Sequence, residues 1–343
     1  MRNIFKGKII LVTGGTGSIG SEIVRQLLRM KPKAIRVFAR HEDRHHQLML
    51  EWTEHTKAIR FIIGDIRDKE RLSLAMEGVD IVLHAAALKH VPLCEYNPFE
   101  AVKTNIIGTQ NVIEVARAAG VSHVIGISTD KAAEPESVLG VSKLMAEKLF
   151  LATYFYRGDK KTKFTCVRFG NVLGSRGSIL SLIKQQIRRD QPVTVTDPDM
   201  TRFFMSIPQA VKLLLDVATK GKGQEIFVLK MPSVRLGDLI EEAIAHFAPL
   251  FGKKPKEVKV AVIGKRSGEK MHEKLLADYE LHAVLETRSL YILTPNQNVF
   301  AQYKKAYAAH PLRSGDRAFT SQHASHISRK ALRAMVEEAS VYL

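Results

Sequence analysis

Residues 128–143 read STDKAAEPESVLGVSK and place an acid directly beside a lysine, with a second lysine at the end of the segment. Asp130 and Lys131 are candidate catalytic residues, because carboxyl groups and amines are the side chains that donate and remove protons in enzymes. Lys143 closes the segment. The pattern therefore directs attention to proton-transfer chemistry, and the rest of the chain must supply the elements that position these groups.

A second chemical motif lies near the N-terminus. The apolar run Ile9–Val12 leads into TGGTGSIG at 13–20 and then into a helical pattern through Ile23 and Leu27. A strand, a glycine turn and a helix in this order are typical of dinucleotide binding, with the phosphates at the helix N-terminus. A flexible turn is the alternative, and the flanking strand and helix argue against it. The candidate cofactor residues of the turn are Thr13, Gly14, Thr16, Gly17, Ser18, Ile19 and Gly20.

Each of three glycines has an expected task. Gly14 permits the tight turn, Gly17 lets the backbone approach a pyrophosphate, and Gly20 lets the helix pack close to the strand.

The second predicted strand, 34–39, ends at Arg40, where an enzyme selective for the unphosphorylated cofactor would place an acid. Arg40, with Arg44 nearby, could instead pair with a 2′-phosphate, so NADP is favoured over NAD. The alternative is that Arg40 is a solvated surface residue or stacks on the adenine. After the third strand, Asp65 and Ile66 are placed to meet the adenine edge.

Strand-like runs alternate with helical segments through the first half of the chain. The runs are 9–12, 35–38, 59–63, 81–83, 124–127 and 165–169. This alternation predicts an α/β fold, a Rossmann-type doubly wound parallel sheet. Functional loops lie at the carboxyl ends of such strands, so the glycine turn and the segment that begins at Ser128 should converge.

After residue 170 the pattern becomes irregular, with loop signals at 174–177 and 196–199. We expect residues 1–170 to form the NAD(P)-binding Rossmann domain and 171–343 to form mainly a smaller substrate-binding region. A helical pattern at 210–217, followed by a strand-like run at 226–229, predicts that the chain returns to the Rossmann unit around 204–230.

The composition is that of a folded protein, with 343 residues, 45% hydrophobic and 25% charged. Two cysteines, Cys94 and Cys166, cannot build a disulfide framework, which fits a reducing compartment. No signal peptide is recognised, and no run approaches the length of about 18 apolar residues that a membrane span requires. We therefore expect a soluble, cytoplasmic protein with no membrane partner.

The formal net charge of +17 raises the possibility of a nucleic-acid-binding protein. The charge lies in short, scattered clusters such as 160–161 and 253–256, and no nucleic-acid motif with interleaved aromatic residues is present. We expect no nucleic-acid partner, and anionic ligands account for part of the charge. His45, His46 and His84 show no metal-ligand spacing, so no metal site is expected.

Five groups of motifs follow one another in an order that carries a family resemblance. They are HAAALKHVP at 84–92, EYNP at 95–98 with TN at 104–105, STDK at 128–131, RFGNV at 168–172 and GEK at 268–270. In this combination the chain resembles the UDP-N-acetylglucosamine 4,6-dehydratases, which are extended short-chain dehydrogenases of bacterial surface-sugar synthesis. The resemblance runs over nearly the whole chain.

The resemblance implies a redox-neutral lyase reaction on UDP-N-acetylglucosamine. The cofactor takes a hydride from sugar carbon 4, water leaves across carbons 5 and 6, and the hydride returns to carbon 6. Carried over by motif, Lys131 is the base that removes the proton from carbon 5, and Asp130 is the acid that protonates the departing hydroxyl. Thr129 orients the hydroxyl on carbon 4, and Lys143 contacts the nicotinamide ribose.

The resemblance also assigns binding positions. It adds Ala85 and Ala86 to the cofactor site. The substrate positions that it implies are Lys89, Asn171, Arg202, Glu269 and Lys270. Simpler interpretations remain open, namely a surface salt bridge for Arg202 and a charge pair at a helix N-terminus for Glu269 and Lys270.

One position departs from the short-chain dehydrogenase pattern, which places a tyrosine four residues before the essential lysine. Here Leu139 precedes Lys143, so the phenol that would take a proton is absent. The first deprotonation must then pass through Thr129, water or Asp130. Because Leu139 offers no acid on the opposite face of the sugar, we predict retention of configuration at carbon 5. A catalytic lysine also needs a lowered pKa, for which Lys89 and Lys143 are candidate neighbours of Lys131.

Two rival functions remain. One is a nucleotide-sugar epimerase or reductase on the same scaffold, which would be expected to keep a tyrosine at position 139. The other is a non-catalytic NAD(P)-binding redox sensor, against which the intact Asp130, Lys131 and Lys143 argue. A homo-oligomer, a dimer or larger, is expected to pair through the predicted long helices around 98–118 and 141–156.

Overall fold

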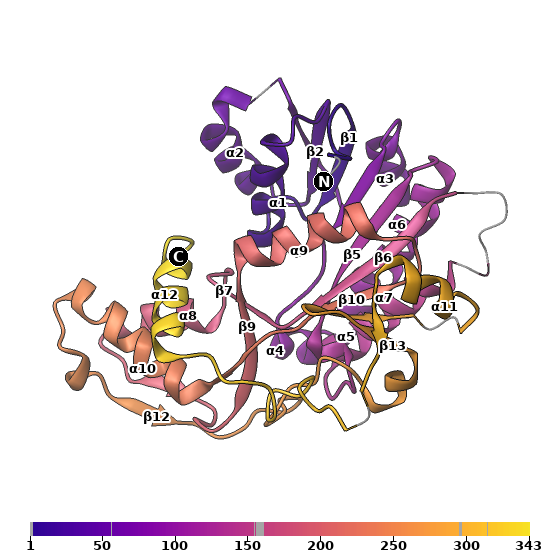
Figure 1. The fold of residues 1–343 in the computed structure, drawn as a ribbon. Coiled ribbons are helices and arrows are strands. Elements are labelled where there is room, and N and C mark those ends of the chain that lie inside the picture. Colours follow the sequence, from indigo (N-terminus) through magenta and orange to yellow (C-terminus); the bar gives the residue numbers. More distant parts are fainter. Residues whose placement is uncertain (1–2, 56, 154, 156–160, 295–296, 314) are drawn as a thin grey trace.

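The computed structural model describes residues 3–55, 57–153, 155, 161–294, 297–313 and 315–343 (Figure 1). Its first half alternates strands and helices. The strands are β1 (Ile9–Thr13), β2 (Ala34–Ala39), β3 (Ile59–Ile63), β4 (Ile81–His84), β5 (His123–Thr129) and β6 (Lys163–Phe169). The longer helices are α1 (Ser18–Leu28), α2 (Glu42–Glu51), α3 (Lys69–Met76), α6 (Gly108–Ala118) and α7 (Val138–Ala152). Each of the six predicted strands is present, so the apolar runs were sufficient to locate them.

These strands form one parallel sheet in the order β3-β2-β1-β4-β5-β6. The order reverses between β1 and β4, and a crevice for a dinucleotide opens at such a switch point. The interior of the sheet is apolar on both faces, with Ile10, Leu11 and Val12 fully buried because helices cover both sides. The predicted Rossmann-type α/β fold is confirmed.

The sheet continues beyond β6 with strands from the second half of the chain. First comes β10 (Ile226–Leu229), parallel to β6, and then three strands joined by antiparallel pairing, β14 (Leu290–Leu293), β13 (Val284–Glu286) and β15 (His310–Pro311). The chain returns to the sheet at 226–229 through α9 (Ile207–Lys220), which crosses the face of the sheet next to α1 (Figure 1). The antiparallel edge was not predicted, because its strands are only two to four residues long.

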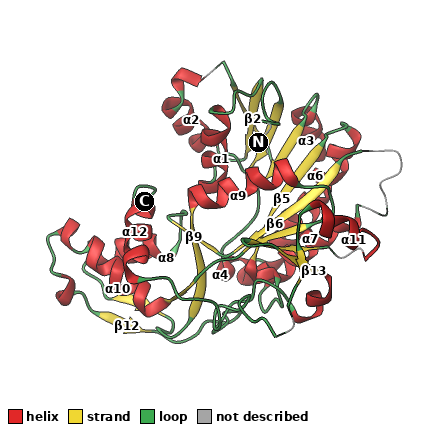
Figure 2. Ribbon diagram, in the orientation of Figure 1, coloured by secondary structure: helices red, strands yellow, loops and turns green. Residues whose placement is uncertain are grey.

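A second lobe with its own apolar core lies beside the sheet (Figure 2). Its strands are β7 (Asn171–Leu173), β9 (Thr201–Ser206) and β11 (Ser233–Arg235) in one sheet, and β8 (Val193–Val195) with β12 (Val260–Val262) in another. Its helices are α8 (Ile179–Arg188), α10 (Leu236–Phe247) and α12 (Arg329–Ser340). Because β7 follows β6 after only one residue, the lobe begins at the carboxyl edge of the main sheet.

Short elements complete the described chain. They are α4 (Val91–Tyr96), α5 (Pro98–Ala101), the π-helix η2 (Val102–Ile107), α11 (Gln297–Ala306) and the 3₁₀ turns η1 (Thr53–His55), η3 (Asp130–Ala132), η4 (Pro249–Phe251), η5 (Pro255–Glu257) and η6 (Asp278–Ala283). The predicted long helix at 98–118 is thus α5, η2 and α6 in succession. The predicted helix at 141–156 corresponds to α7, and its last positions extend into residues outside the described part. Among the described residues, no helix has the length and apolar character needed to span a membrane.

Candidate active site

The glycine turn between β1 and α1 has the geometry that its sequence predicts. Gly14 has φ +67°, a left-handed conformation that favours glycine. A Cβ at Gly14 would lie 2.7 Å from the Ala86 nitrogen, and one at Gly20 would lie 2.2 Å from the Gly14 oxygen. Both positions therefore exclude larger side chains, and the helix packs against the turn as closely as expected.

A cavity of about 500 Å³ opens in front of this turn at the carboxyl edge of β1, β2 and β4. Every predicted cofactor residue except Thr13 and Lys143 lines it. The predicted residues in its wall are Gly14, Thr16, Gly17, Ser18, Ile19, Gly20, Arg40, Asp65, Ile66, Ala85 and Ala86. Thr13 is buried behind the wall, where its hydroxyl contacts His84 Nδ1 at 2.7 Å. The structure thus brings the predicted cofactor residues together around a space suited to a dinucleotide.

Positive groups gather at one part of this cavity. They are the arginines Arg40, Arg44 and Arg176, and His41 lies in the same wall. Burial lowers the pKa of His41, and the charges of the three arginines lower it further. Arg40 also lies 3.6 Å from Asp65 Oδ2, so the cavity wall already offers it an acidic partner.

Sequence reasoning missed Arg176, because it comes from the irregular segment after residue 170. Its backbone nitrogen donates to Ser18 Oγ at 3.0 Å, and its guanidinium contacts the Thr16 carbonyl. The loop that carries Arg176 therefore closes over the glycine turn.

Thr129, Asp130 and Lys131 lie where β5 ends and η3 begins. Thr129 Oγ1 donates to Asp130 Oδ1 at 2.9 Å, and Lys131 Nζ donates to the same oxygen at 3.0 Å. Lys131 Nζ also donates to Asn171 Oδ1 at 3.2 Å. Residues from β5, η3 and β7 thus meet in one hydrogen-bonded group, as the sequence predicts for loops at the carboxyl ends of strands.

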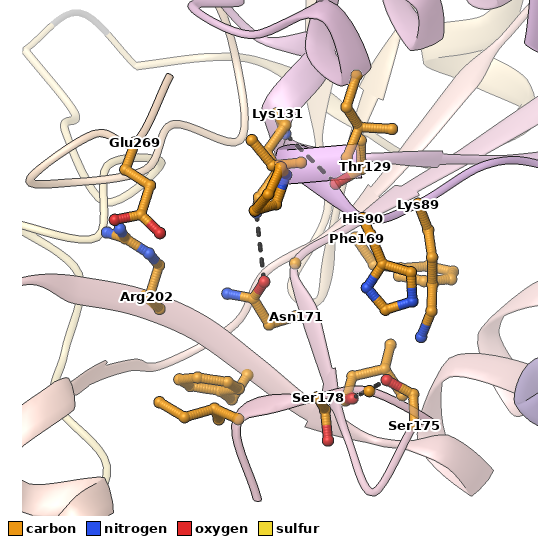
Figure 3. Close-up of a pocket in the computed structure, with 18 of the residues that line it drawn as sticks. Lys89, His90, Thr129, Lys131, Phe169, Asn171, Ser175, Ser178, Arg202 and Glu269 are labelled. Atoms are coloured by element: carbon orange, nitrogen blue, oxygen red, sulfur yellow. Dashed lines mark hydrogen bonds between the residues drawn. The ribbon is translucent and has the colours of Figure 1, made fainter. Parts of the chain in front are cut away.

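This group faces a second cavity of about 480 Å³, which adjoins the first and shares Ile19, Ala85 and Lys89 with it. Figure 3 shows Lys131 and Asn171 meeting in the middle, with Arg202 and Glu269 on one side and Lys89 on the other. Asp130 is fully buried behind the wall.

The lysine has a neighbour that the sequence did not reveal. Glu273 Oε1 lies 3.3 Å from Lys131 Nζ and 3.6 Å from Arg202 Nε. Glu273 follows the GEK motif by three residues, and that proximity was the only available signal. Only 3% of Glu273 is exposed, so its carboxylate is buried next to both basic side chains.

The expected lowering of the Lys131 pKa is contradicted. Burial does act in that direction, but the charges of Asp130 and Glu273 outweigh it and raise the pKa of Lys131 above its usual value. The two lysines predicted as cationic neighbours of Lys131 make other contacts. The Lys89 ammonium donates to the Arg176 carbonyl at 2.7 Å, and the Lys143 ammonium donates to the Ile127 carbonyl. At rest, therefore, Lys131 carries its proton.

Asp130 differs from an ordinary carboxyl group. Burial raises its pKa, the charge of Lys131 opposes this rise, and the charge of Glu273 adds to it, with a raised value as the result. A raised pKa favours the protonated carboxyl group, which is the form that a general acid needs.

Lys143 and Leu139 both lie on α7 and line the second cavity. Burial lowers the pKa of Lys143. Leu139 is only 5% exposed and presents an apolar wall where the sequence pattern lacks its tyrosine. His84 is a buried, neutral side chain, since burial and the charge of Lys143 lower its pKa to about 3.

The predicted substrate residues separate into two groups. Lys89, Asn171, Arg202 and Glu269 line the second cavity, and Arg266, which sequence reasoning missed, joins them. Lys270 lines neither cavity; its ammonium donates to the carbonyls of Ala133 and Glu134. That contact ties the 268–273 segment to the turn after Lys131.

Other motif residues position the site from outside it. Asn105 donates to the Leu88 carbonyl at 3.1 Å and accepts from the Leu88 nitrogen at 2.8 Å, which fixes the loop after β4. Glu95 Oε1 accepts from the Val138 nitrogen at 2.7 Å at the start of α7. Within the described part of the chain, no group of three or more His, Cys, Asp or Glu side chains could hold a metal ion.

Comparison with known proteins gives a consistent result. The family described as "Polysaccharide biosynthesis protein" matches residues 10–295. An "Uncharacterized membrane protein MJ1061" of Methanocaldococcus jannaschii is 56% identical over 85% of this chain and 87% of its own length. A "UDP-N-acetylglucosamine 4,6-dehydratase (inverting)" of Campylobacter jejuni is 42% identical over 85% of this chain and 84% of its own length.

A solved structure extends the likeness to the whole chain. The X-ray structure of Pen from Bacillus thuringiensis superimposes with a TM-score of 0.91 at 40% identity, and covers 99% of each chain. The antiparallel edge and the second lobe are therefore included in the likeness.

Proposed function

Since the chain belongs to the polysaccharide biosynthesis protein family, we propose that it is a nucleotide-sugar 4,6-dehydratase acting on UDP-N-acetylglucosamine. The observation that carries this proposal is the meeting of Lys131 and Asn171 in the wall of one cavity, with Asp130 hydrogen-bonded behind them, next to a second cavity lined by the glycine turn. A proton-transfer centre beside a cofactor site is what a redox-neutral dehydration requires.

The cofactor that we propose is NADP or NAD. A bound nicotinamide would supply the acceptor for the hydride of carbon 4 and the donor for carbon 6. The cavity in front of the glycine turn is lined by Gly17 and by Ser18 at the N-terminus of α1, where a pyrophosphate would bind. NADP is favoured because Arg40, Arg44 and Arg176 line the same cavity, where a 2′-phosphate could meet them.

The chain's own residues would divide the proton chemistry. Thr129 orients the hydroxyl on carbon 4, whose proton leaves through Thr129, water or Asp130 as the hydride leaves carbon 4, and Lys143 contacts the nicotinamide ribose. Once carbon 4 is a ketone, the hydrogen on carbon 5 is acidic. Lys131 must first release to solvent the proton that it carries at rest, and its neutral amine then takes the carbon-5 proton on Nζ. Asp130 would be the acid for the hydroxyl on carbon 6; because it lies behind the cavity wall, its proton would pass through the Thr129 hydroxyl that is hydrogen-bonded to Oδ1, and the carbon–oxygen bond breaks to release water.

We propose that residues 1–170 mainly hold the cofactor and that 171–343 mainly hold the sugar nucleotide. UDP would be held by Asn171, Arg202 and Glu269, with Lys89 at the boundary of the two cavities. Lys270 would act indirectly, because it contacts the turn after Lys131 and not the substrate.

The configuration at carbon 5 needs its own test. Leu139 supplies no proton from the cavity wall, and on that basis retention is the prediction, whereas the relative from Campylobacter jejuni is named inverting. Dehydration in deuterated water, followed by proton NMR from the first minutes, reads the label and the configuration at carbon 5. A D-configured product supports a single base that removes and returns the proton, and an L-arabino product in the earliest spectra contradicts it.

The proposed function is tested by incubating the protein with UDP-N-acetylglucosamine and following the products by NMR. A 4-keto-6-deoxy sugar nucleotide formed without net consumption of cofactor is the expected result. A product that differs from the substrate only at carbon 4 would indicate an epimerase, and consumption of NADPH would indicate a reductase. An unchanged substrate with tight cofactor binding would favour the redox-sensor alternative.

A further inference from the structure

Glu273 is a buried carboxylate that the mechanism above does not use. One oxygen, Oε1, faces both Lys131 Nζ at 3.3 Å and Arg202 Nε at 3.6 Å. The other oxygen, Oε2, is fully buried and has no hydrogen-bond partner among the described residues. A buried carboxylate oxygen left without a donor is destabilising, so its presence beside the proposed base calls for a role.

The backbone holds Glu273 from two sides. Its nitrogen donates to Ser321 Oγ at 2.8 Å, and its carbonyl accepts from the Ser321 nitrogen at 2.8 Å. The Ser321 hydroxyl also contacts Thr201 Oγ1 at 2.7 Å, and Thr201 adjoins Arg202 on β9. The position of the carboxylate is therefore set by the segment around Ser321 and by β9, while Lys131 follows β5 of the main sheet.

The charges that face Glu273 come from three elements. Lys131 and Asp130 lie on η3, Arg202 lies on β9, and Lys270 lies on the segment of Glu273 itself. Burial would raise the pKa of Glu273, but Lys131, Arg202 and Lys270 outweigh burial and lower it. Glu273 is thus the ionised carboxylate of the centre, and Asp130, with its raised pKa, is the one suited to hold a proton.

We propose that Glu273 is a positioning residue of the dehydration centre, which holds the Lys131 ammonium opposite Asp130 and sets the pH at which that amine becomes a base. This inference rests on the proposed function. Asp130 alone could hold Lys131 in place through its 3.0 Å contact. The added charge of Glu273 instead determines which groups carry protons, because it favours the protonated form of Lys131 and disfavours the ionised form of Asp130.

The substitution Glu273→Gln preserves shape and removes the charge. An opposite charge within about 4–6 Å typically changes a pKa by about 1–3 units, so the loss of Glu273 should lower the pKa of Lys131 by an amount of this order. The pKa of Asp130 should fall as well, because a like charge is removed. Both limbs of the bell-shaped pH–rate profile should therefore move to lower pH. A purely structural role would lower the rate without moving the limbs.

Two measurements test the proposal. The first is the pH dependence of kcat and kcat/KM for dehydration, followed by NMR. The second is trace labelling with acetic anhydride from roughly pH 6 to pH 11, a range chosen to follow the titration of an amine. Peptide mass spectrometry then measures how much Lys131 is acetylated. Labelling reports the protonation of the amine whether or not the protein turns over substrate.

The matched variants are Glu273→Gln, Glu273→Asp and Glu242→Gln. Glu242 is equally buried, 3% exposed, and pairs with Arg333 in the second lobe outside both cavities. We expect the labelling midpoint of Lys131 to fall in Glu273→Gln, to fall less in Glu273→Asp and to stay unchanged in Glu242→Gln. If Glu273→Gln does not fold, the intermediate change in Glu273→Asp carries the test.

The outcomes separate the two proposals. A Lys131 midpoint that is unchanged in the folded Glu273 variants overturns the inference, even if the wild-type protein is a dehydratase. A lowered midpoint supports the role of Glu273 even if no dehydration is found, in which case the proposed function fails by itself. Parallel acidward movement of both rate limbs supports both proposals.

Discussion

At the residue scale, the proposed chemistry depends on one amine and the groups around it. Lys131 Nζ contacts Asp130, Asn171 and Glu273, and these three residues come from three different segments of the chain. The acidic groups beside Lys131 raise the pKa of its amine, so Lys131 is a base only after its proton has left. The protonation state of Lys131, and not only its position, therefore controls when carbon 5 can be deprotonated.

The first prediction concerns Lys131→Ala. We expect dehydration to fall by roughly 10²–10⁴-fold or more, the usual contribution of a general base, while NADP affinity changes little. The reason is that Lys131 lines the second cavity and not the one around the glycine turn. Product NMR measures the first effect and fluorescence titration with NADPH the second. Lys148→Ala, an exposed lysine on α7, is the control, and near wild-type turnover in Lys131→Ala would show that another group is the base.

The second prediction concerns Arg40. A charge-assisted contact with a 2′-phosphate contributes about 1.5–3 kcal/mol, which corresponds to roughly a tenfold to hundredfold preference for NADP over NAD. Arg40→Ala should remove most of that preference. Titration of stripped enzyme with both reduced cofactors measures it, with the exposed Arg29→Ala as the control. Equal affinities that Arg40→Ala leaves unchanged would make Arg40 a bystander paired with Asp65.

At the scale of elements, a buried ion network joins α7, β6 and η6. The fully buried Arg168 donates to both oxygens of Glu147, at 3.0 and 2.7 Å, and to both oxygens of Glu280, at 2.8 and 2.9 Å. Glu147 lies one turn after Lys143 on α7. The network therefore holds the helix that carries Lys143 against the sheet.

The third prediction concerns Arg168→Leu, which would leave two carboxylates buried without a cation. The free energy of unfolding at pH 7 should fall by about 3–5 kcal/mol. In the wild type, Arg168 helps to lower the pKa of Glu280, so the stability it supplies is present above the ordinary pKa of a glutamate and is lost as pH falls through the lowered value.

Urea unfolding at pH 7 and pH 4 measures this effect. The difference between wild type and Arg168→Leu should shrink at pH 4, because the orphaned carboxyls of the variant can then become neutral. The exposed pair Arg235–Asp199 provides the control, since Arg235→Leu should change stability by no more than about 1 kcal/mol. An Arg168→Leu protein with wild-type stability would show that the network is dispensable.

At the scale of the whole molecule, large apolar side chains are exposed on three helices that contact one another, α4, α5 and α7. They are Leu93, Tyr96, Phe99, Val141 and Met145, with Tyr96 87% and Phe99 78% exposed. Large exposed apolar side chains gathered on helices that contact one another are typical of a subunit interface. We propose that a second copy of the chain docks there.

The fourth prediction follows from this surface. Light scattering coupled to size-exclusion chromatography should find a dimer or larger assembly, and Phe99→Asp combined with Met145→Asp should favour the monomer, because each buried charge would lack a partner. Leu250→Asp, 63% exposed on η4 of the second lobe, is the control. A wild-type monomer at micromolar concentration would refute the proposal.

The sequence by itself determined the features that depend on neighbouring residues. The six parallel strands were predictable because each is a short apolar run, and the cofactor turn because Gly14 and Gly20 occupy positions where a Cβ would collide. The convergence of the glycine turn with Thr129 and Lys131 followed from topology alone, since parallel strands present their carboxyl ends at one edge.

Only the tertiary structure decided which distant groups meet there. Glu273 reaches Lys131 from a segment more than 140 residues later in the chain, and Arg176 closes over the glycine turn, yet both come from segments without regular periodicity. The same holds for the pKa of Lys131, which the sequence assigned the wrong direction. A pKa depends on the charges within a few ångströms, and long-range packing, not local spacing, selects those charges.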